Sequence, residues 1–435
     1  MRISTDHWNT IRDHLDHAGS GERFGFALTE QLATAPDGGP VLRVVDTLLV
    51  ADDETTNDDT GWYVADTAVD RVHNHATTRR LGLVEFHNHH IGPPGFSHTD
   101  EAAIDPMATY AVDLLGQTYG AAVYADEPLD AEVWYHHHDG IARRPISTVV
   151  VADADRLRVL NARPRPGNRF NRQDALLGPH GQATLAGLRI ALIGAGGTGA
   201  HVATGLAHLG ARNVLVLDDD IVEDTNMNRL VTATAADIGA PKNLVARRRM
   251  LEIDTTMNVV ALPGLTIDGD HPELQDVDLI IGCVDHDGPR DRLNQLAVTT
   301  NIPYIDLATG LDPSTHPPAL GGRIIVVAPD GPCLHCHHEL DAAEIADWAK
   351  PPEQRAIDHQ HGYGTSSANP SVVHLNGIAA YSALAELAAW VSETRPPAQR
   401  LDLDLNGHLT HPDAPAGSRL NPANHGRRTS CHACG

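Results

Sequence analysis

The sequence predicts an α/β protein of two units, an α+β unit followed by a unit with a doubly wound parallel sheet. The chain has 435 residues, more than one domain usually needs. A segment rich in Pro, Gly and Arg at 161–168 separates two regions of different pattern. Beyond this segment, short apolar runs alternate with helix-length stretches. We therefore predict a first domain at 1–157, a linker at 158–168 and a second domain at 169–435.

The first unit mixes apolar runs of strand length with segments of helical periodicity. A polar stretch at 51–60 (ADDETTNDDT) predicts a loop. The expected strands are 41–50, 83–87, 121–125 and 146–152, and the expected helices lie around 66–79 and 99–115.

The second unit begins with an apolar run, LRIALIGAG, and further apolar runs follow it along the chain. Because helix-length segments separate these runs, they predict parallel strands joined by crossover helices. The expected strands are 188–196, 213–219, 258–263, 278–284, 302–307 and 321–329, and a long helix is expected at 371–393.

Charge and composition exclude two classes of partner. The formal net charge is −25, whereas a nucleic-acid-binding protein needs a basic face for phosphates. No apolar run is long enough to span a bilayer, and the N-terminus has no apolar core of a secretion signal. We therefore expect no nucleic acid, no membrane and a cytoplasmic location. Because Lys242 and Lys350 are the only lysines among 32 basic residues, a lysine within a motif is informative.

Four histidines, a serine and an aspartate gather in the segment EFHNHHIGPPGFSHTD. His87 and His89 are two positions apart, so on a strand both point to the same face and can reach one metal ion. Asp100, from the helix that follows, can complete three protein ligands and leave a fourth zinc position for water, as in catalytic sites. Glu22, just before an apolar strand, could serve as general base. Ser97 could donate a hydrogen bond to the oxyanion that forms when an amide is attacked.

A glutamate before a strand, followed by H-x-H-x7-S-x2-D, resembles the motif of the JAMM (MPN/JAB) metalloproteases, a family of deubiquitinases and their prokaryotic relatives. The resemblance covers roughly residues 1–150 and implies a catalytic zinc and the hydrolysis of peptide or isopeptide bonds. The proline that usually follows the second histidine in this family is His90 here, and His98 is a bystander. A histidine-rich surface loop and a metal site without catalysis remain alternatives.

The segment IALIGAGGTGAHVATGL joins a strand to a helix through a glycine-rich turn. Glycines let the backbone approach a phosphate, and the helix N-terminus favours the anion. Asp218 ends the next expected strand, a position suited to a ribose hydroxyl. The turn alone is a weak signal of dinucleotide binding, and by itself it would indicate an ordinary NAD-dependent enzyme. Its glycines are Gly194, Gly196, Gly197 and Gly199.

Charged residues beyond this strand favour nucleotidyl transfer over hydride transfer. Arg229 and Lys242 could stabilise the negative charge of a leaving pyrophosphate, which hydride transfer does not need. Asp285, after the fourth strand, is placed to hold magnesium. Asp220 is most often a surface acid in such a position, but it could also contact the magnesium ion or the substrate.

Together these pieces resemble the ThiF/MoeB-type family, the adenylating domain of ubiquitin-activating enzymes. The family's R-[YF]-x-R-Q opening is present with Arg169 and Arg172, and its D-x-D-x-V-x-x-x-N-x-x-R segment is present with Asn226. The resemblance implies a Rossmann-like fold, ATP and magnesium as cofactors, and Asn226 among the nucleotide-binding residues. It implies adenylation of the C-terminal glycine of a ubiquitin-like or sulfur-carrier protein. It also implies a homodimer in which Arg172 reaches the neighbouring subunit's nucleotide.

Four of the five cysteines form two CxxC pairs, which in a cytosolic chain predict zinc before a disulfide. MoeB-like proteins carry such a site, so we expect a structural zinc in addition to the catalytic one. Cys283 lies inside an apolar run and is expected to be a buried packing residue. Thioester-forming relatives place their nucleophile after the strand at 302–307, where this chain has no cysteine, so we expect an acyl-adenylate as the product. The four expected zinc ligands are Cys333, Cys336, Cys431 and Cys434.

The combined interpretation is a bifunctional protein. One unit adenylates the terminal glycine of a ubiquitin-like or sulfur-carrier protein with ATP, and the zinc unit trims that carrier or releases it from conjugates. Two alternatives stay open: activation of a sulfur carrier for thiolation in cofactor or amino-acid biosynthesis, and adenylation with maturation of a small modified peptide. A scaffold of inactive domains is disfavoured because the motifs are intact.

Overall fold

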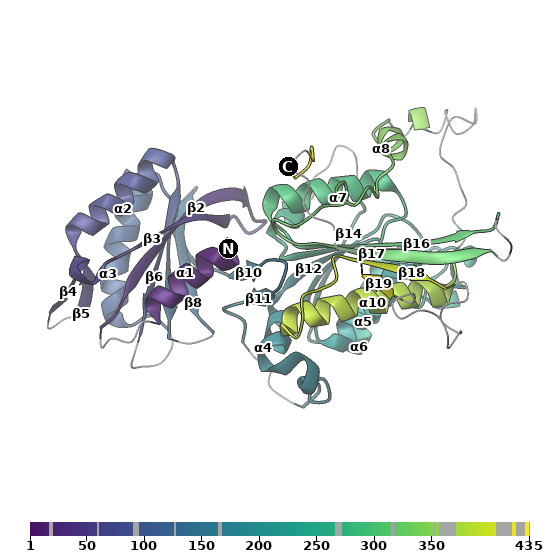
Figure 1. Cartoon of the computed structure of the whole chain (residues 1–435), viewed down its shortest axis with the longest axis horizontal. Helices are drawn as coiled ribbons and strands as arrows, with labels where there is room; N and C mark the ends of the chain where they lie inside the picture. Colours follow the sequence, from purple (N-terminus) through teal and green to yellow (C-terminus); the bar gives the residue numbers. More distant parts are fainter. Residues whose placement is uncertain are drawn as a thin grey trace. The chain divides into compact units, whose positions relative to one another are not determined.

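The computed structural model divides into two compact units (Figure 1). Unit 1 comprises Met1–Ala152 and Leu157–Arg163, and unit 2 comprises Asp153–Arg156 and Pro164–Gly435. Within the described residues, no helix is both long and apolar enough to cross a membrane. The structure describes residues 1–16, 21–58, 61–89, 95–125, 128–163, 168–265, 272–314, 316, 318–351, 353–355, 371–405, 420–422 and 431–434.

Unit 1 is built on a nine-stranded sheet with the order β11-β10-β1-β3-β2-β6-β7-β8-β9. Its central pairs are antiparallel between β2 and β6 and parallel between β6 and β7. A separate two-stranded ribbon, β4 and β5, lies outside this sheet. The strands are β1 (Arg2–Ile3), β2 (Phe24–Thr34), β3 (Pro40–Leu49), β4 (Thr55–Asp58), β5 (Gly61–Val64), β6 (Gly82–Asn88), β7 (Tyr119–Tyr124), β8 (Asp130–His137), β9 (Gly140–Pro145), β10 (Val150–Ala152) and β11 (Leu157–Val159).

Three α-helices cover the two faces of this sheet. Helix α1 (Thr5–Leu15) packs Trp8 and Ile11 against Phe86 of β6 on one face. Helices α2 (Asp66–Arg79) and α3 (His98–Thr109) pack on the other face, where the buried residues of β6 and β7 include Leu83 and Tyr119. Because strand side chains alternate, the odd-numbered residues of β6 point toward α2 and α3.

Several expectations for unit 1 differ from the structure. The polar stretch at 51–60 forms a 3-10 turn (Asp52–Glu54) and strand β4, so it is not a loop throughout. The expected strand at 146–152 is reduced to β10, and just before it the side chain of Asn161 bonds to Val149 N and Ile146 O. Strand β11 also begins inside the first unit and extends into the predicted linker.

The helix expected at 99–115 is divided. Helix α3 contains Pro106, which has no backbone N–H to donate to the preceding turn. The helix ends at Thr109 and continues as a π-helical turn, η2 (Tyr110–Leu114), closed by a bond from Leu115 N to Tyr110 O.

Unit 2 contains an eight-stranded sheet with the order β14-β13-β12-β15-β16-β17-β18-β19. The first five strands pair in parallel and the last three pair antiparallel, so the doubly wound parallel sheet is confirmed and extended at one edge. The strands are β12 (Arg189–Ile193), β13 (Asn213–Leu217), β14 (Asn258–Leu262), β15 (Leu279–Gly282), β16 (Tyr304–Asp312), β17 (Ala319–Val327), β18 (Arg400–Asp404) and β19 (Leu420–Pro422).

Helices cover both faces of the parallel part of this sheet. Figure 1 shows α7 and α8 on one side, and α4, α5, α6 and α10 on the other. Since the connection from β12 goes to β13 and the connection from β15 goes to β16, the winding reverses between β12 and β15. Ligands in such folds bind beyond the carboxyl ends of the strands at this reversal. The helices are α4 (Asp174–Gly187), α5 (Gly197–Leu209), α6 (Lys242–Ile253), α7 (Asp287–Thr300), α8 (Ala342–Trp348) and α10 (Val373–Ser392), with 3-10 turns at Asp224–Asn226, Ala235–Asp237 and Pro272–Asp276.

Candidate functional sites

A cavity of about 1190 Å³ opens where the winding of the unit 2 sheet reverses. Its walls come from the carboxyl ends of β12, β13 and β15 and from the hairpin of β16 and β17. Most of the residues predicted to bind a nucleotide line it. They are Gly194, Gly196, Gly197, Asp218, Asp220, Arg229, Lys242 and Asp285.

The glycine-rich turn between β12 and α5 depends on close backbone contacts. Gly194 has φ +91°, a left-handed conformation that favours glycine. A Cβ atom on Gly199 would lie 1.9 Å from the carbonyl oxygen of Gly194. A Cβ atom on Gly197 would lie 2.2 Å from Nδ2 of the fully buried Asn376 on α10. The turn is therefore packed tightly from behind, and α5 begins with its N-terminus at the cavity.

Asp218 is held against this turn. One carboxylate oxygen accepts a bond of 2.6 Å from Ala195 N, and the other accepts a bond of 2.9 Å from Asp220 N. Burial raises the pKa of Asp218, although these N–H groups and Lys242 oppose the effect. The carboxylate is therefore fixed in place, with lone pairs left for a ribose hydroxyl.

Two cations and an exposed acid lie at the edge of the cavity. Lys242, at the start of α6, donates from Nζ to Oδ2 of Asp220 at 2.7 Å. Arg229 is held by a bond of 2.9 Å from its guanidinium to Thr225 O. Asp285 follows β15 by three residues, lines the cavity and is exposed. Carboxylate oxygens are suitable ligands for magnesium beside a triphosphate, and the donor set fits.

The sequence suggested that Cys283 lies in the interior of a strand, but the structure places it elsewhere. Strand β15 ends at Gly282, and Cys283 is partly exposed and lines the cavity beside the glycine-rich turn. Burial of its thiol, together with the charge of Asp306, raises the pKa of Cys283. The thiol is therefore protonated and a poor nucleophile.

Three residues of the predicted adenylation site do not line this cavity in the described part of the chain. Asn226 is buried and its Oδ1 accepts from Glu223 N, so it stabilises the turn that carries Arg229. Gly199 supports the turn from behind. Arg172 is exposed just before α4. The neighbouring Arg169 bonds to Ile253 O at the end of α6.

Other cavity residues had no signal in the sequence. Trp348 and Arg355 line the cavity from the segment that contains α8. Trp348 packs over Gly288, where a Cβ atom would lie 2.3 Å from it. Ser371 lines the cavity and bonds to Asn376 at 2.9 Å. No motif marks these residues, because they reach the site from segments far along the chain.

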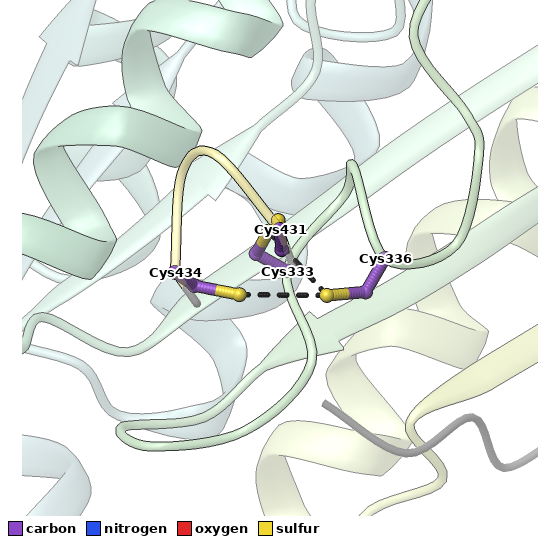
Figure 2. A group of neighbouring side chains, drawn as sticks. All are labelled: Cys333, Cys336, Cys431 and Cys434. Atoms are coloured by element: carbon purple, nitrogen blue, oxygen red, sulfur yellow. Dashed lines mark hydrogen bonds between the residues drawn. The ribbon is translucent and has the colours of Figure 1, made fainter. Parts of the chain in front are cut away.

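The two CxxC pairs meet in one cluster, as Figure 2 shows. The Sγ atoms of Cys333 and Cys336 are 3.9 Å apart. Sγ of Cys333 lies 3.6 Å from Sγ of Cys431, and Sγ of Cys336 lies 3.4 Å from Sγ of Cys434. Sulfur atoms around a tetrahedral zinc, with bonds of about 2.3 Å, lie ~3.8 Å apart. The four buried sulfur atoms therefore fit a structural zinc. Burial raises the pKa of Cys333 and Cys434, whereas bonds from the backbone N–H groups of Ala433 and Cys434 outweigh burial and lower the pKa of Cys431.

In unit 1, His87, His89 and Asp100 form a second cluster that could hold a metal ion. His87 Nε2 lies 3.5 Å from Oδ1 of Asp100, and His89 Nε2 lies 3.2 Å from Oδ2. Both ring nitrogens of His87 are buried, and neither forms a well-aligned hydrogen bond with a described residue. Orphaned imidazole nitrogens beside a carboxylate fit a three-ligand zinc site.

The electrostatics of this cluster also favour a cation. Burial lowers the pKa of His87, but the carboxylates of Asp100 and Glu85 raise it to about 9. Burial acts to raise the pKa of Asp100, but His87 and His89 lower it well below its usual range. Positive charge between these groups is therefore stabilised, and a bound metal ion supplies such charge.

The two other residues of the predicted zinc site lie beside this cluster. Phe24 of β2 pairs with His87 of β6, and Asn88 N bonds to Arg23 O. If this antiparallel register continues by one more residue, Glu22 lies opposite His89. Ser97 caps α3, where its Oγ accepts from Asp100 N at 3.2 Å. His98 is exposed away from the cluster, and His90 lies outside the described residues.

The sequence of unit 2 matches a known family. A family model described as the ThiF family matches residues 170–431, more than half of the chain. The chain belongs to the ThiF family. The match begins after the end of unit 1 at Arg163.

Several curated proteins resemble this ThiF-family chain. It is 31% identical to the sulfur carrier protein adenylyltransferase of Thermus thermophilus, over 47% of this chain and 73% of that protein. It is 29% identical to the SAMP-activating enzyme E1 of Haloferax volcanii, over 37% of this chain and 57% of that protein. It is 28% identical to the sulfur carrier protein ThiS adenylyltransferase of Escherichia coli, over 39% of this chain and 66% of that protein. Among solved structures, E. coli MccB with succinimide aligns at 21% identity and a TM-score of 0.48, over 62% of this chain and 75% of that chain.

Proposed function

We propose that unit 2 uses ATP and magnesium to adenylate the C-terminal glycine of a ubiquitin-like or sulfur-carrier protein. A carboxylate oxygen of that glycine attacks the α-phosphorus of ATP, the bond to the β-phosphate oxygen breaks, and pyrophosphate leaves. The proposal depends on one observation. A glycine-rich turn at a helix N-terminus, two cations and a carboxylate at the end of a strand all line the same cavity. This combination suits a leaving pyrophosphate, whereas hydride transfer has no use for Lys242 and Arg229.

Each residue has a role in this reaction. The N–H groups of the glycine-rich turn bind phosphate oxygens, and Asp218 accepts from a ribose hydroxyl. Arg229 and Lys242 stabilise the charge that develops on pyrophosphate. Asp285 would hold magnesium, and Asp220 assists by holding Lys242 at the edge of the cavity.

The shape of the cavity supports a substrate tail of small residues. Beyond the nucleotide-binding residues, the cavity follows β16 and β17, where Gly310, Gly321 and Gly322 line it. Gly310, where a Cβ atom would meet nothing within 4 Å, leaves room for an extended backbone, whereas the missing Cβ atoms of Gly321 and Gly322 make room for the neighbouring strands. The names of the Thermus, Haloferax and E. coli relatives, which refer to sulfur carrier proteins or to SAMP, support a carrier protein as the owner of that tail.

We propose that the reaction stops at the acyl-adenylate. Four of the five cysteines belong to the proposed zinc cluster, which leaves Cys283 as the remaining thiol. Its raised pKa argues against attack on the adenylate. Thiolation of a sulfur carrier and ligation of a ubiquitin-like protein both begin from this same intermediate.

We propose that unit 1 hydrolyses a peptide or isopeptide bond to the same carrier. His87, His89 and Asp100 would hold a zinc ion, which when bound activates water for attack on an amide. Glu22 accepts the proton of the attacking water and passes it to the leaving amine. Ser97 donates a hydrogen bond to the carbonyl oxygen as it gains charge.

We propose that the active form is a homodimer. Arg172 is exposed and does not line the cavity of its own chain in the described structure, which supports a role in the neighbouring subunit. Apolar side chains of α10, including Val373, Ile378 and Tyr381, are exposed and offer a surface for a second copy. Mixed Arg172→Ala and Asp285→Ala chains should then recover part of the activity that each variant lacks. Complementation that fails between folded, exchanging chains would contradict the shared site.

The two proposed activities can be tested in one experiment. A carrier with a short extension after its terminal glycine is incubated with the protein, ATP and magnesium, and its intact mass is followed. We expect loss of the extension and then gain of one adenylyl group. A pre-trimmed carrier could be adenylated while the extended one stays intact. The two units would then not act in sequence on that carrier, and unit 1 would be tested by cleavage of an isopeptide-linked conjugate.

A further inference from the structure

Strand β6 places a third ionisable side chain beside the proposed zinc ligands. Glu85, His87 and His89 alternate along the strand and its extension, so they share the face that α2 and α3 cover. The carboxylate of Asp100 faces Nε2 of His87. Oε1 of Glu85 faces the opposite ring nitrogen, Nδ1, at 3.5 Å. This distance exceeds a formed hydrogen bond of about 2.9 Å, but it leaves the carboxylate as an acceptor on the Nδ1 side of the ring.

A tyrosine holds Glu85 from the other side. Tyr119 donates from its hydroxyl to Oε2 of Glu85 at 2.8 Å. It is fully buried on β7, where it pairs with Leu83 of β6. Its ring is parallel to the ring of His73, with an interplanar angle of 6°, and meets Trp134 edge to face. The hydroxyl is therefore fixed, and with it the carboxylate that faces His87.

We propose that Glu85, held by Tyr119, is a positioning residue that orients His87 as a metal ligand. A neutral imidazole carries its proton on one nitrogen and offers a lone pair on the other. An acceptor at Nδ1 keeps the proton there and directs the lone pair of Nε2 toward Asp100 and the metal position. The inference rests on the proposed zinc site of unit 1, but it does not depend on peptidase activity.

The geometry also separates Glu85 from the general base. Its two oxygens face His87 Nδ1 and the Tyr119 hydroxyl, on the side of the imidazole away from Asp100. Strand register places Glu22 opposite His89, on the β2 side of β6, whereas Tyr119 lies on β7 at the other side of β6. Glu85 and Glu22 should therefore affect different measurements, metal affinity in the first case and hydrolysis in the second.

The test measures metal binding to the full chain with zinc retained in the four-cysteine cluster. Affinity for Zn²⁺ at the second site is obtained by competition with a chromogenic chelator, and Co²⁺ absorption reports the ligand geometry. Glu85→Leu should weaken Zn²⁺ binding about 10- to 100-fold and change the Co²⁺ spectrum. Glu85→Gln, whose amide oxygen still accepts from Nδ1, should recover much of the affinity. Glu30→Gln, on β2 where Glu30 pairs with Arg43, serves as the control and should bind Zn²⁺ as the unaltered chain does.

A double-variant comparison separates orientation from general damage to the fold. Tyr119→Phe should weaken Zn²⁺ binding severalfold in the unaltered chain but not further in the Glu85→Leu background, since Tyr119 acts through Glu85. Equal losses in both backgrounds would overturn the relay. Unchanged affinity in Glu85→Leu would overturn the inference while leaving the zinc site in place. An unaltered chain that binds zinc only at its cysteines would remove the site itself, and the inference with it.

Discussion

Lys242 donates a hydrogen bond of 2.7 Å from Nζ to Oδ2 of Asp220 at the edge of the unit 2 cavity. The Asp220 side chain is 68% exposed, so water screens the pair and its contribution to folding stability is small, about 0 to 1 kcal/mol. The ammonium group is therefore held close to the cavity at little cost and is available to a phosphate group. The pair connects the segment that follows β13 to the start of α6.

Lys242→Ala should lower ATP–pyrophosphate exchange about 100- to 1,000-fold, because it removes a cation from the leaving group. Lys350→Ala is the matched control. Lys350 also pairs with an aspartate, Asp347, at 2.9 Å, but it does not line the cavity. Equal loss of exchange in both variants, at unchanged thermal stability, would contradict a specific role for Lys242.

The glycines of the turn should separate stability from nucleotide binding. A Cβ atom on Gly196 meets nothing within 4 Å in the folded chain, yet Gly196 lines the cavity. Gly196→Ala should therefore keep its thermal stability and lose ATP binding, measured by calorimetry. Gly199→Ala should instead destabilise unit 2 by about 1 to 3 kcal/mol or more, because its Cβ atom meets the backbone of Gly194. The reverse pattern would mean that the turn does not approach the phosphates.

Elemental analysis should find two zinc ions per chain. His87→Ala should remove one of them without changing the thermal unfolding of unit 2. Cys431→Ser should remove the other and lower the stability of unit 2, because the cluster ties residues 98 positions apart. Chelation should release the zinc of unit 1 first, since a three-ligand site exchanges more readily than a closed one. A content of one zinc that His87→Ala does not change would exclude the metal site in unit 1.

Glu22→Gln should keep both zinc ions and lose hydrolysis by about 100-fold or more, because it removes the proton acceptor and preserves size. The comparison is with Glu30→Gln. Glu30 lies in β2, the strand that Glu22 precedes, and pairs with Arg43. The assay follows cleavage of an extended or isopeptide-linked carrier. Near-full activity in Glu22→Gln would assign the base to another carboxylate.

The parallel sheet of unit 2 was predictable because each strand there is a continuous apolar run. Runs such as LRIALIGAG mark both the strand and the turn that follows, so the expected and observed strands agree closely. The CxxC pairs were equally informative, since their spacing indicates shared ligation before any fold is known. Confirmation of the ThiF family rests on this same half of the chain.

Unit 1 was harder to predict, for identifiable reasons. Helix α1 is short and holds its apolar residues at Trp8, Ile11 and Leu15, between polar and charged neighbours. The side chain of Asn161 bonds to Val149 N and Ile146 O just before β10, contacts that no local pattern indicates. Tyr119 belongs to a different strand from Glu85, so their contact arises only from sheet register.

The most direct test of the account is ATP–pyrophosphate exchange with a candidate carrier that ends in Gly-Gly, compared with the same carrier lacking its last glycine or amidated there. Exchange requires a carboxylate that forms the adenylate reversibly. We predict exchange that depends on magnesium and on the free terminal glycine, and that Asp285→Ala abolishes. Exchange that proceeds equally with the amidated carrier, or ATP binding with no exchange for any glycine-terminated carrier, would contradict the account.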